Sequence, residues 1–320
     1  MEIRRRSELE VFFAGTHPIR QDAPEVRFME AVCAGDAAGA AGLFRERKLF
    51  GGGLPVVDTP YGRFEGLEEI GRFAREWNST FGATASFPVP CIQTTAGGRS
   101  VLEVSVNFTR DGAVDQVPMF VVADYRTADS LEEVRIYCTY AMIPGCTPYR
   151  KPLFSAERLL PGDPGLLTGA VREYYEALHT FPAADVPRIV AAMEDRVVMG
   201  GYHFFDPEKY PGDFGRTKEQ IAESFRFMST YIPGDVSMRY ETVIDDGRTG
   251  VLEWVHVLSE RGSKELGRIA MSGIAAYERG QSGLLCSVRI LDYAWKEKEI
   301  DWTKTPVTRE EALSMNIRKE

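Results

Sequence analysis

The spacing of apolar residues predicts helices first and strands afterwards in the first half of the chain. Ile70, Phe73 and Trp77 recur at helical spacing, whereas residues 101–108 alternate between apolar and polar side chains. The pattern predicts helices over residues 24–34, 36–44 and 66–82, a loop over 51–60, and strands over 101–108, 114–125 and 131–142.

The second half repeats this order of elements. Asp185 followed by Pro187, and Thr217 followed by Gln220 three residues later, are signals for the N-termini of helices. The pattern predicts a helix over 166–179, helices beginning at Asp185 and Thr217, and strands over 236–244, 250–260, 265–279 and 284–295.

Short stretches of the first half also return in the second half in the same order. The segment beginning at Val101 returns from Val251, and the one beginning at Val134 returns from Val288. The matches of residues 30–32 with 176–178, 101–104 with 251–254, 123–125 with 275–277 and 134–136 with 288–290 have offsets of 146, 150, 152 and 154. A period near half the chain indicates two copies of one domain rather than a solenoid.

The order of elements predicts an α+β fold, in which three helices close one face of a curved antiparallel sheet. Both faces of the strand from Val251 to Leu258 are apolar. We therefore expect a second layer behind it, and a sheet-to-sheet pseudo-dimer of the two repeats. The expected organisation is an N-terminal extension (1–21), domain 1 (22–145), a proline-rich linker (146–164), domain 2 (165–297) and a C-terminal tail (298–320).

Charge and composition exclude several classes of partner. The net charge of -9 argues against nucleic acid, because phosphate binding needs a basic face. No stretch reaches the ~18 apolar residues of a membrane helix, and the charged N-terminus lacks a signal-peptide core. Five cysteines without paired spacing indicate reduced thiols and a cytoplasmic location. The chain has no metal-binding or nucleotide-binding motif, so neither a metal nor another cofactor is expected.

The order of elements, together with the spacing of Gly66, Ile70 and Phe73, resembles the nuclear transport factor 2-like superfamily and within it the SnoaL-like polyketide-cyclase branch. The resemblance covers residues 24–143 and 166–296. It implies cone-shaped domains in which a bent sheet and a helix enclose an apolar pocket, and pairing through the sheets. Members include isomerases, dehydratases, cyclases and proteins without catalytic activity, so the fold indicates where a site lies and not its chemistry.

The histidines are distributed unevenly between the repeats. His17 precedes the first repeat, whereas His179, His203 and His256 lie in the second. His256 aligns with Val106 and could be a pocket base, although a hydrogen-bonded core histidine fits equally. His203 follows the expected second helix in a segment that rims the pocket in the resembled fold, and a solvated loop histidine is its alternative.

Other candidates follow from the resemblance. Tyr174 lies on the first helix of repeat two, where relatives place a tyrosine that stabilises an oxyanion, and packing alone also explains it. Asp292 could orient a histidine or act as base, and an exposed edge carboxylate is its alternative. Substrate-binding candidates are Tyr202, Tyr210, Tyr240 and Trp254 in repeat two, and Asp58, Tyr61, Asn107 and Tyr137 in repeat one.

These observations lead to two functional hypotheses. In the first, repeat two binds a small hydrophobic oxygenated molecule and acts as a cofactor-independent lyase, isomerase or cyclase. His256 or His203 would be the base, Asp292 its partner, and Tyr174 or Tyr202 the donor. In the second, the chain is a binding or scaffold protein with vestigial pockets, since neither repeat holds a complete set of catalytic groups. The expected partner is a small hydrophobic ligand; neither nucleic acid nor a membrane is expected, and pairing into a homo-oligomer stays open.

Overall fold

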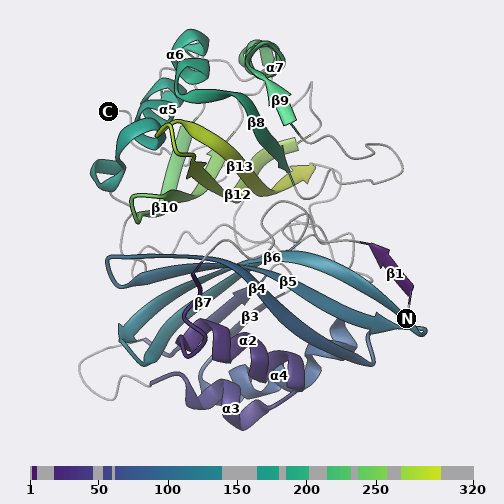
Figure 1. Ribbon diagram of the computed structural model, residues 1–320. Helices are drawn as coiled ribbons and strands as arrows, with labels where there is room; N and C mark the ends of the chain where they lie inside the picture. Colours follow the sequence, from purple (N-terminus) through teal and green to yellow (C-terminus); the bar gives the residue numbers. More distant parts are fainter. Residues whose placement is uncertain are drawn as a thin grey trace. The chain divides into compact units, whose positions relative to one another are not determined.

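The computed structural model divides the chain into two compact units, unit 1 from Met1 to Thr147 and unit 2 from Pro148 to Glu320 (Figure 1). The division falls inside the segment predicted as a linker, residues 146–164. The structure describes the backbone of residues 2–5, 18–45, 53–59, 62–138, 164–179, 185–201, 215–231, 237–257 and 268–296.

Unit 1 combines three helices with a mixed sheet. Its described elements are β1 (Glu2–Arg5), α2 (Pro24–Ala34), α3 (Ala37–Gly42), β2 (Val56–Thr59), β3 (Gly62–Glu65), α4 (Leu67–Thr80), β4 (Ala85–Ala96), β5 (Arg99–Arg110), β6 (Ala113–Thr127) and β7 (Ser130–Cys138). The strands lie in the order β3-β2-β7-β6-β5-β4, and β1 pairs with β6. Gly35, with a φ of 71°, ends α2, and the Asp36 carboxylate accepts a hydrogen bond from the Gly39 N–H at the start of α3.

Unit 2 contains the same kinds of element. They are η2 (Pro164–Leu166), α5 (Gly169–His179), α6 (Val186–Ala191), β8 (Met193–Gly201), β9 (Gly215–Thr217), α7 (Lys218–Tyr231), β10 (Ser237–Asp245), β11 (Thr249–Val257), β12 (Arg268–Arg279) and β13 (Leu285–Lys296). Asp185 caps α6 through the Arg188 N–H. The predicted capping box is confirmed, because Thr217 and Gln220 exchange hydrogen bonds of 3.0 and 3.4 Å at the start of α7.

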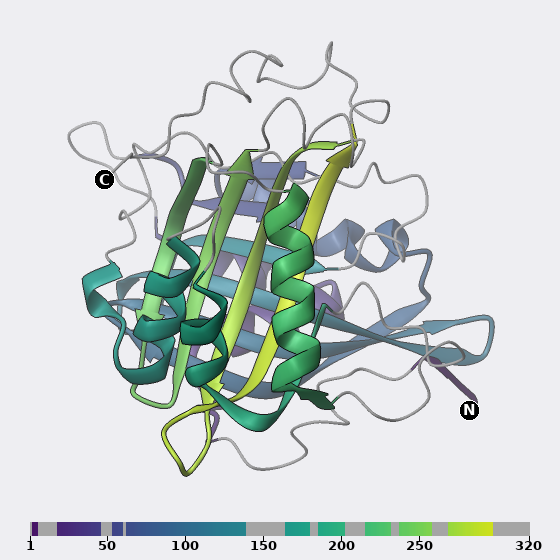
Figure 2. The ribbon, with the colours of Figure 1, turned by 90° about the horizontal axis from the view of Figure 1, so that it is seen from above.

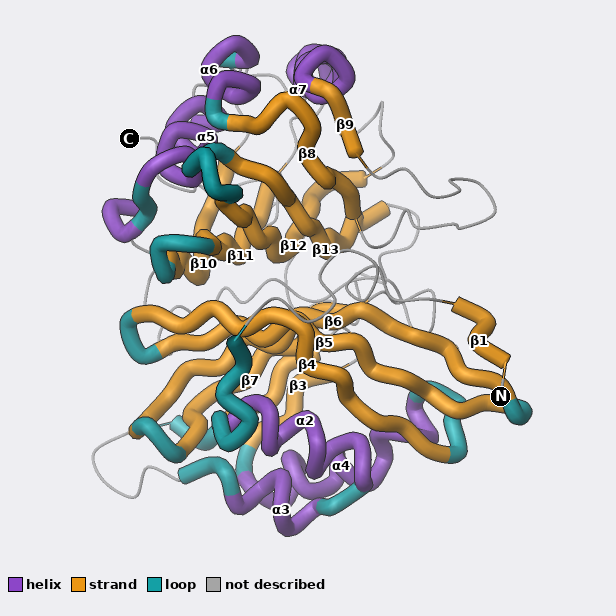
Figure 3. The backbone as a smooth tube through the Cα atoms, viewed as in Figure 1, coloured by secondary structure: helices purple, strands orange, loops and turns teal. Residues whose placement is uncertain are grey.

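In each unit the helices cover one face of the sheet, as Figures 2 and 3 show for unit 2 and unit 1 respectively. Several features differ from the sequence prediction, and neither the short strand β3 nor the long strand β4 was predicted. The sheets are mixed rather than antiparallel, because β2 runs parallel to β7 and β8 runs parallel to β13. The segment predicted as a loop contains β2, a strand of only four residues. Parallel neighbouring strands need a long connection. The chain between β2 and β7, which includes α4, provides it in unit 1, and the chain between β8 and β13, which includes α7, provides it in unit 2.

Apart from β1, the two sheets have the same strand order, and they share two irregularities. The order of unit 2 is β9-β8-β13-β12-β11-β10, which matches unit 1 strand for strand. The register shifts between Asp124 and Tyr125 in β6, and between Glu278 and Arg279 in β12. A second shift lies between Pro90 and Ile92 in β4 and between Tyr240 and Thr242 in β10.

The register corrects one of the sequence matches. Leu102 pairs with Val121 in unit 1, and its counterpart Leu252 pairs with Ala275 in unit 2. Ala275 is therefore the counterpart of Val121, not of Ala123 as the sequence match had it. The counterpart of Ala123 is Tyr277, two residues further along β12. A match of three residues allows a two-residue slip, whereas pairing with the flanking strands does not.

Candidate functional site

The space between the helices and the sheet of unit 1 is filled by aromatic rings. Phe28 stacks on Phe73 with ring centroids 6.3 Å apart, and Phe81 stacks on Phe108 at 4.3 Å. The rings that contact one another in this core are Phe28, Phe44, Phe64, Phe73, Trp77, Phe81 and Phe108. This packing occupies the volume in which the resemblance implies a pocket.

The corresponding region of unit 2 contains a pair of buried tyrosines whose rings contact each other. Tyr174 of α5 lies against Tyr277 of β12, with ring centroids 5.0 Å apart, and its other side contacts Phe225 of α7 at 6.0 Å. Only 3% of Tyr174 and 5% of Tyr277 is exposed. Between residues that the structure describes, no hydrogen bond involves either hydroxyl. The pair therefore brings two phenol groups beneath the helices of unit 2.

The environment keeps both phenols protonated. Burial raises the pKa of Tyr174 well above its usual value, and the neighbouring Tyr277 raises it further. Burial also raises the pKa of Tyr277. A neutral phenol in an apolar surrounding is a hydrogen-bond donor, and its attraction for a carbonyl or enolate oxygen is strengthened by the low local dielectric.

The two units differ at these positions. With the offset of 146 that relates their first helices, Tyr174 corresponds to Phe28, and the strand register makes Tyr277 the counterpart of Ala123. Unit 1 thus has no hydroxyl at either position. Tyr174 was predicted from the sequence, but Tyr277 was not. No signal in the sequence alone indicated Tyr277, because its position beneath α5 follows only from the strand register.

The backbone of β10 to β13 brings three predicted site residues into one row. Tyr240 pairs with Trp254, Trp254 with Gly273, and Gly273 with Asp292. His256 lies two residues further along β11. For these residues, apart from the glycine, the structure describes the backbone alone.

The strand register shows which residues of unit 1 correspond to His256 and Asp292. His256 corresponds to Val106, and Asp292 corresponds to Cys138. Val106 and Cys138 are fully buried and belong to the core cluster beneath the helices of unit 1. Two ionisable residues of unit 2 thus occupy register positions at which unit 1 has apolar core side chains.

The remaining candidates of unit 2, and one of unit 1, lie outside the described residues. They are His203, Tyr202, Tyr210 and Tyr61. The roles assigned to them stay predictions.

The other candidates of unit 1 lie on the sheet face that points away from the helices. Asp58, Asn107 and Tyr137 each alternate with core residues that face the helices. All three are buried, Asp58 lies 3.7 Å from the Arg63 guanidinium, and Asn107 donates a long hydrogen bond of 3.4 Å to the carbonyl of Ser105. They do not line the space beneath α2.

A surface cleft of about 290 Å³ lies between β3 and α4 of unit 1. It is lined by Gly62, Arg63, Phe64, Arg72, Phe73, Glu76 and Thr80. Arg63 pairs with Glu65 at 2.7 Å, and Arg72 pairs with Glu69 and Glu76 at 2.5 and 3.0 Å. Because both guanidinium groups already engage carboxylates, the cleft offers little attraction for an anion.

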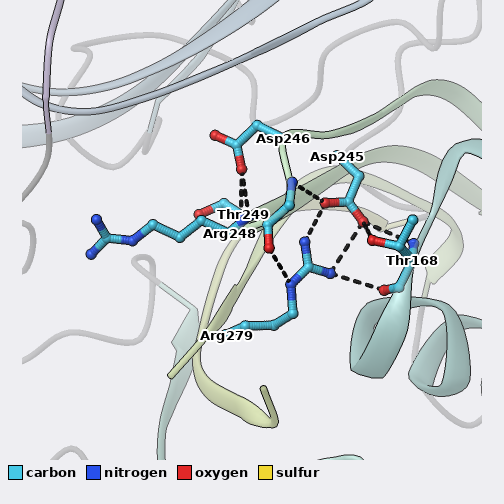
Figure 4. Close-up of polar contacts among 7 residues, drawn as sticks. Thr168, Asp245, Asp246, Arg248, Thr249 and Arg279 are labelled. Carbon is cyan, nitrogen blue, oxygen red and sulfur yellow. Dashed lines mark hydrogen bonds and ion pairs between the residues drawn. The ribbon is translucent and has the colours of Figure 1, made fainter. Parts of the chain in front are cut away.

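A polar cluster holds the first helix of unit 2 on its sheet (Figure 4). The Asp245 carboxylate accepts hydrogen bonds of 2.9 Å from both the backbone N–H and the hydroxyl of Thr168, which precedes α5. Arg279 forms an ion pair with Asp245 and donates a hydrogen bond of 2.9 Å to the Thr168 carbonyl. These contacts link α5 to β10 and β12, and so position Tyr174 over Tyr277.

The described part of the chain contains no group of three His, Cys, Asp or Glu side chains arranged to hold a metal ion. Within the same residues, no helix is long and apolar enough to cross a membrane.

Neither a family model nor a curated protein matches the sequence. Similar solved structures include a hypothetical protein with a ketosteroid isomerase-like fold from Catenulispora acidiphila, in complex with trimethylamine. It is 14% identical, covers 40% of this chain and 91% of its own, and has a TM-score of 0.32. An NTF2-like protein of unknown function from Cytophaga hutchinsonii is 13% identical over 39% of this chain and 96% of its own, with a TM-score of 0.29. A protein from Kribbella flavida is 15% identical over 38% and 89%, also with a TM-score of 0.29. Similarities this weak do not assign the chain to a family.

Proposed function

We propose that unit 2 binds a small hydrophobic molecule that carries a carbonyl or enol oxygen, in the space beneath α5. The observation that supports this most directly is the contact between Tyr174 and Tyr277, buried where unit 1 has Phe28 and Ala123. A buried phenol usually has a hydrogen-bond partner. A ligand oxygen between the two hydroxyls would provide one, and the apolar core around them would bind the rest of the molecule.

We further propose that the ligand is a substrate for proton transfer. His256 or His203 is the base, Asp292 orients it, and Tyr174 with Tyr277 donates to the substrate oxygen. The base removes a proton from the carbon next to the carbonyl, and the C–H electron pair moves into the enolate, whose oxygen the phenols stabilise. Return of the proton from the histidine to another carbon gives isomerisation. Its transfer to a neighbouring hydroxyl, which leaves as water, gives dehydration. Attack of the enolate carbon on a second carbonyl, whose oxygen takes up the proton, gives cyclisation.

The chain is best interpreted as a tandem pair of NTF2-like domains of the SnoaL-like type. The shared strand order and the two shared register shifts support a duplication. The cone shape of each domain and the sheet-to-sheet pairing of the two stay predictions of the resemblance.

The alternative function, binding or scaffolding without catalysis, is favoured for unit 1. Its aromatic core fills the region of the pocket, and its counterparts of Tyr174, Tyr277, His256 and Asp292 are all apolar or weakly polar. In this interpretation unit 1 stabilises the chain while unit 2 holds the site.

Two naphthalene derivatives, one with and one without a ketone group, test the binding proposal. The full-length protein would be titrated with 2-acetonaphthone, a flat ketone, and with 2-ethylnaphthalene, which has nearly the same shape but no oxygen. We expect the ketone to bind at least tenfold more tightly, and the Tyr174→Phe and Tyr277→Phe variants to lose this preference. Tyr125→Phe, the same change in unit 1, is the control. Equal binding of the two compounds by the wild-type protein would refute the proposal.

Proton exchange tests the catalytic step. The acetyl protons of 2-acetonaphthone exchange with D2O through the enolate, and NMR follows their loss. We expect the protein to accelerate the exchange and His256→Ala or His203→Ala to abolish the acceleration. Acceleration that survives both substitutions would remove the histidines from the mechanism.

A further inference from the structure

Gly273 lies in the interior of the sheet of unit 2, in the middle of β12. It is buried, and it pairs with Trp254 on one side and Asp292 on the other. Ala275 and Tyr277 of the same strand belong to the core beneath the helices. Because side chains alternate along a strand, Gly273 is on the same face as these two residues.

Backbone geometry does not account for this glycine. The register of β12 with both neighbours is continuous from Ala270 to Glu278, so Gly273 is not at a bulge. It is not among the glycines with positive φ, so an L side chain would meet no conformational strain. Glycine in a strand interior lowers stability, and close approach of another group to the backbone is one reason to have a glycine there.

Comparison with unit 1 shows what the glycine changes. The register makes Met119 the counterpart of Gly273, and Val121 the counterpart of Ala275. Met119 and Val121 are fully buried and pack against the helices of unit 1. In unit 2 the same two positions have a hydrogen atom and a methyl group, next to the position where Tyr277 replaces Ala123. On β12 the residues at these two positions are thus smaller than in unit 1, whereas the residue opposite Gly273 on β11 is larger, Trp254 in place of Val104.

We propose that Gly273 determines the depth of the ligand site in unit 2, by allowing the flat apolar part of the ligand to lie against the backbone of β12. This inference rests on the proposed function and names the residue that selects ligands by length. The oxygen of the ligand is held by Tyr174 and Tyr277, and the ring system extends along β12 towards Gly273. Gly273 lies four residues from Tyr277, about 13 Å along the strand, so an extended ligand with a bicyclic ring system approaches Gly273 from the tyrosines, whereas a single small ring does not.

The test replaces Gly273 with the residue of unit 1. Full-length wild type, Gly273→Ala and Gly273→Met would be titrated with 2-acetonaphthone and with cyclohexanone, a ketone too short to reach residue 273. We expect the affinity for 2-acetonaphthone to fall about threefold in Gly273→Ala and at least thirtyfold in Gly273→Met. Binding of cyclohexanone should stay within twofold of wild type in both. Val288→Ala, a substitution in the same core on the neighbouring strand β13, is the control for general loosening of the core.

The short ketone separates a role in selectivity from a role in packing. Loss of both ketones in Gly273→Met would mean that Gly273 serves the packing of the sheet, and retention of both would mean that it does not border the ligand; either result overturns the inference. These failures differ from failure of the proposed function, in which the wild-type protein itself shows no preference for 2-acetonaphthone over 2-ethylnaphthalene.

Discussion

Arg289 and Glu278 form a buried ion pair in unit 2, at the register positions at which Arg135 and Asp124 pair in unit 1. The nitrogen–oxygen distances are 2.9 and 2.5 Å, and 1% or less of each arginine side chain is exposed. In both units the acid directly precedes the register shift of the central strand, and the arginine lies diagonally across on the next strand. The same ion pair therefore braces the same irregularity in both sheets.

Each of these acids also holds a second arginine. Asp124 pairs with Arg99, and Glu278 pairs with Arg248 at 3.0 Å. Arg99 lies directly opposite Asp124, whereas Arg248 precedes Thr249, the residue opposite Glu278. The positions of the second arginines thus differ by one residue between the units, but the two arginines pair with equivalent carboxylates.

Removal of Arg289 should destabilise the protein strongly. The Arg289→Met variant removes the buried partner of the Glu278 carboxylate, and breaking such a pair costs about 3 kcal/mol. Urea unfolding followed by circular dichroism measures the loss. Arg172→Met, which removes an exposed pair with Glu176 on α5, should leave the midpoint close to wild type. Similar midpoints for the two variants would contradict the structural importance of the pair.

Exchanging single hydroxyls between the units should have opposite consequences. Phe28→Tyr places a hydroxyl among the rings of unit 1, and an unpaired buried hydroxyl costs about 1–3 kcal/mol. Tyr174→Phe should not lower the stability of the free protein, because its hydroxyl has no partner among the described residues. Thermal melts of the two variants provide the measurement. A large loss in Tyr174→Phe would show that the hydroxyl already has a partner within the chain.

The buried tyrosines should make the fold sensitive to alkali. The folded pKa values of Tyr174 and Tyr277 lie above the unfolded value of about 10. Their contribution to stability is therefore complete below pH ~10, and is lost as the pH rises through the folded pKa values. Absorbance near 295 nm should show them ionising only as the protein unfolds, after the exposed members of the 13 tyrosines. Tyr277→Phe should shift alkaline unfolding to higher pH, and an unchanged midpoint would count against its burial.

Asp245 should contribute to stability at neutral pH and not in acid. Burial acts to raise the pKa of Asp245, but hydrogen bonds from Arg279, the Gly247 N–H and Thr168 outweigh it and leave the pKa below its usual value. The contribution is therefore present above the unfolded pKa of about 4 and is lost as the pH falls through the lower folded pKa. Asp245→Asn should be less stable than wild type at pH 7, and the difference should shrink towards pH 2. If the difference in stability between Asp245→Asn and wild type stayed constant from pH 7 to pH 2, the effect would not come from the charge of Asp245.

The ends of helices could be predicted from the sequence because capping is local. Asp36, Asp185 and the pair Thr217 with Gln220 bond to backbone groups within three residues of themselves. The long strands from Arg99 and Ala113 were predictable for a similar reason, since alternation is visible within one segment. The strand Val56–Thr59 was not, because four residues form a strand only through pairing with β3 and β7.

The candidate site was predictable only in part. Tyr174 could be named because the resembled superfamily places a tyrosine on the corresponding helix. Tyr277 could not, since its position beneath α5 depends on a register that only the neighbouring strands define. The significance of Gly273 was hidden for the same reason, because its comparison with Met119 requires the corrected register. The buried ion pairs join residues on different strands, and no local pattern indicated them.

The sequence by itself determined the helices, most of the long strands, the repetition of their order, and the unequal distribution of histidines between the halves. It could do so because periodicity, capping and composition are properties of neighbouring residues. The tertiary structure alone decided which residues meet. Strand register, parallel pairing and the partners of buried charges depend on contacts between residues far apart in the chain, and a slip of one or two residues changes every such contact.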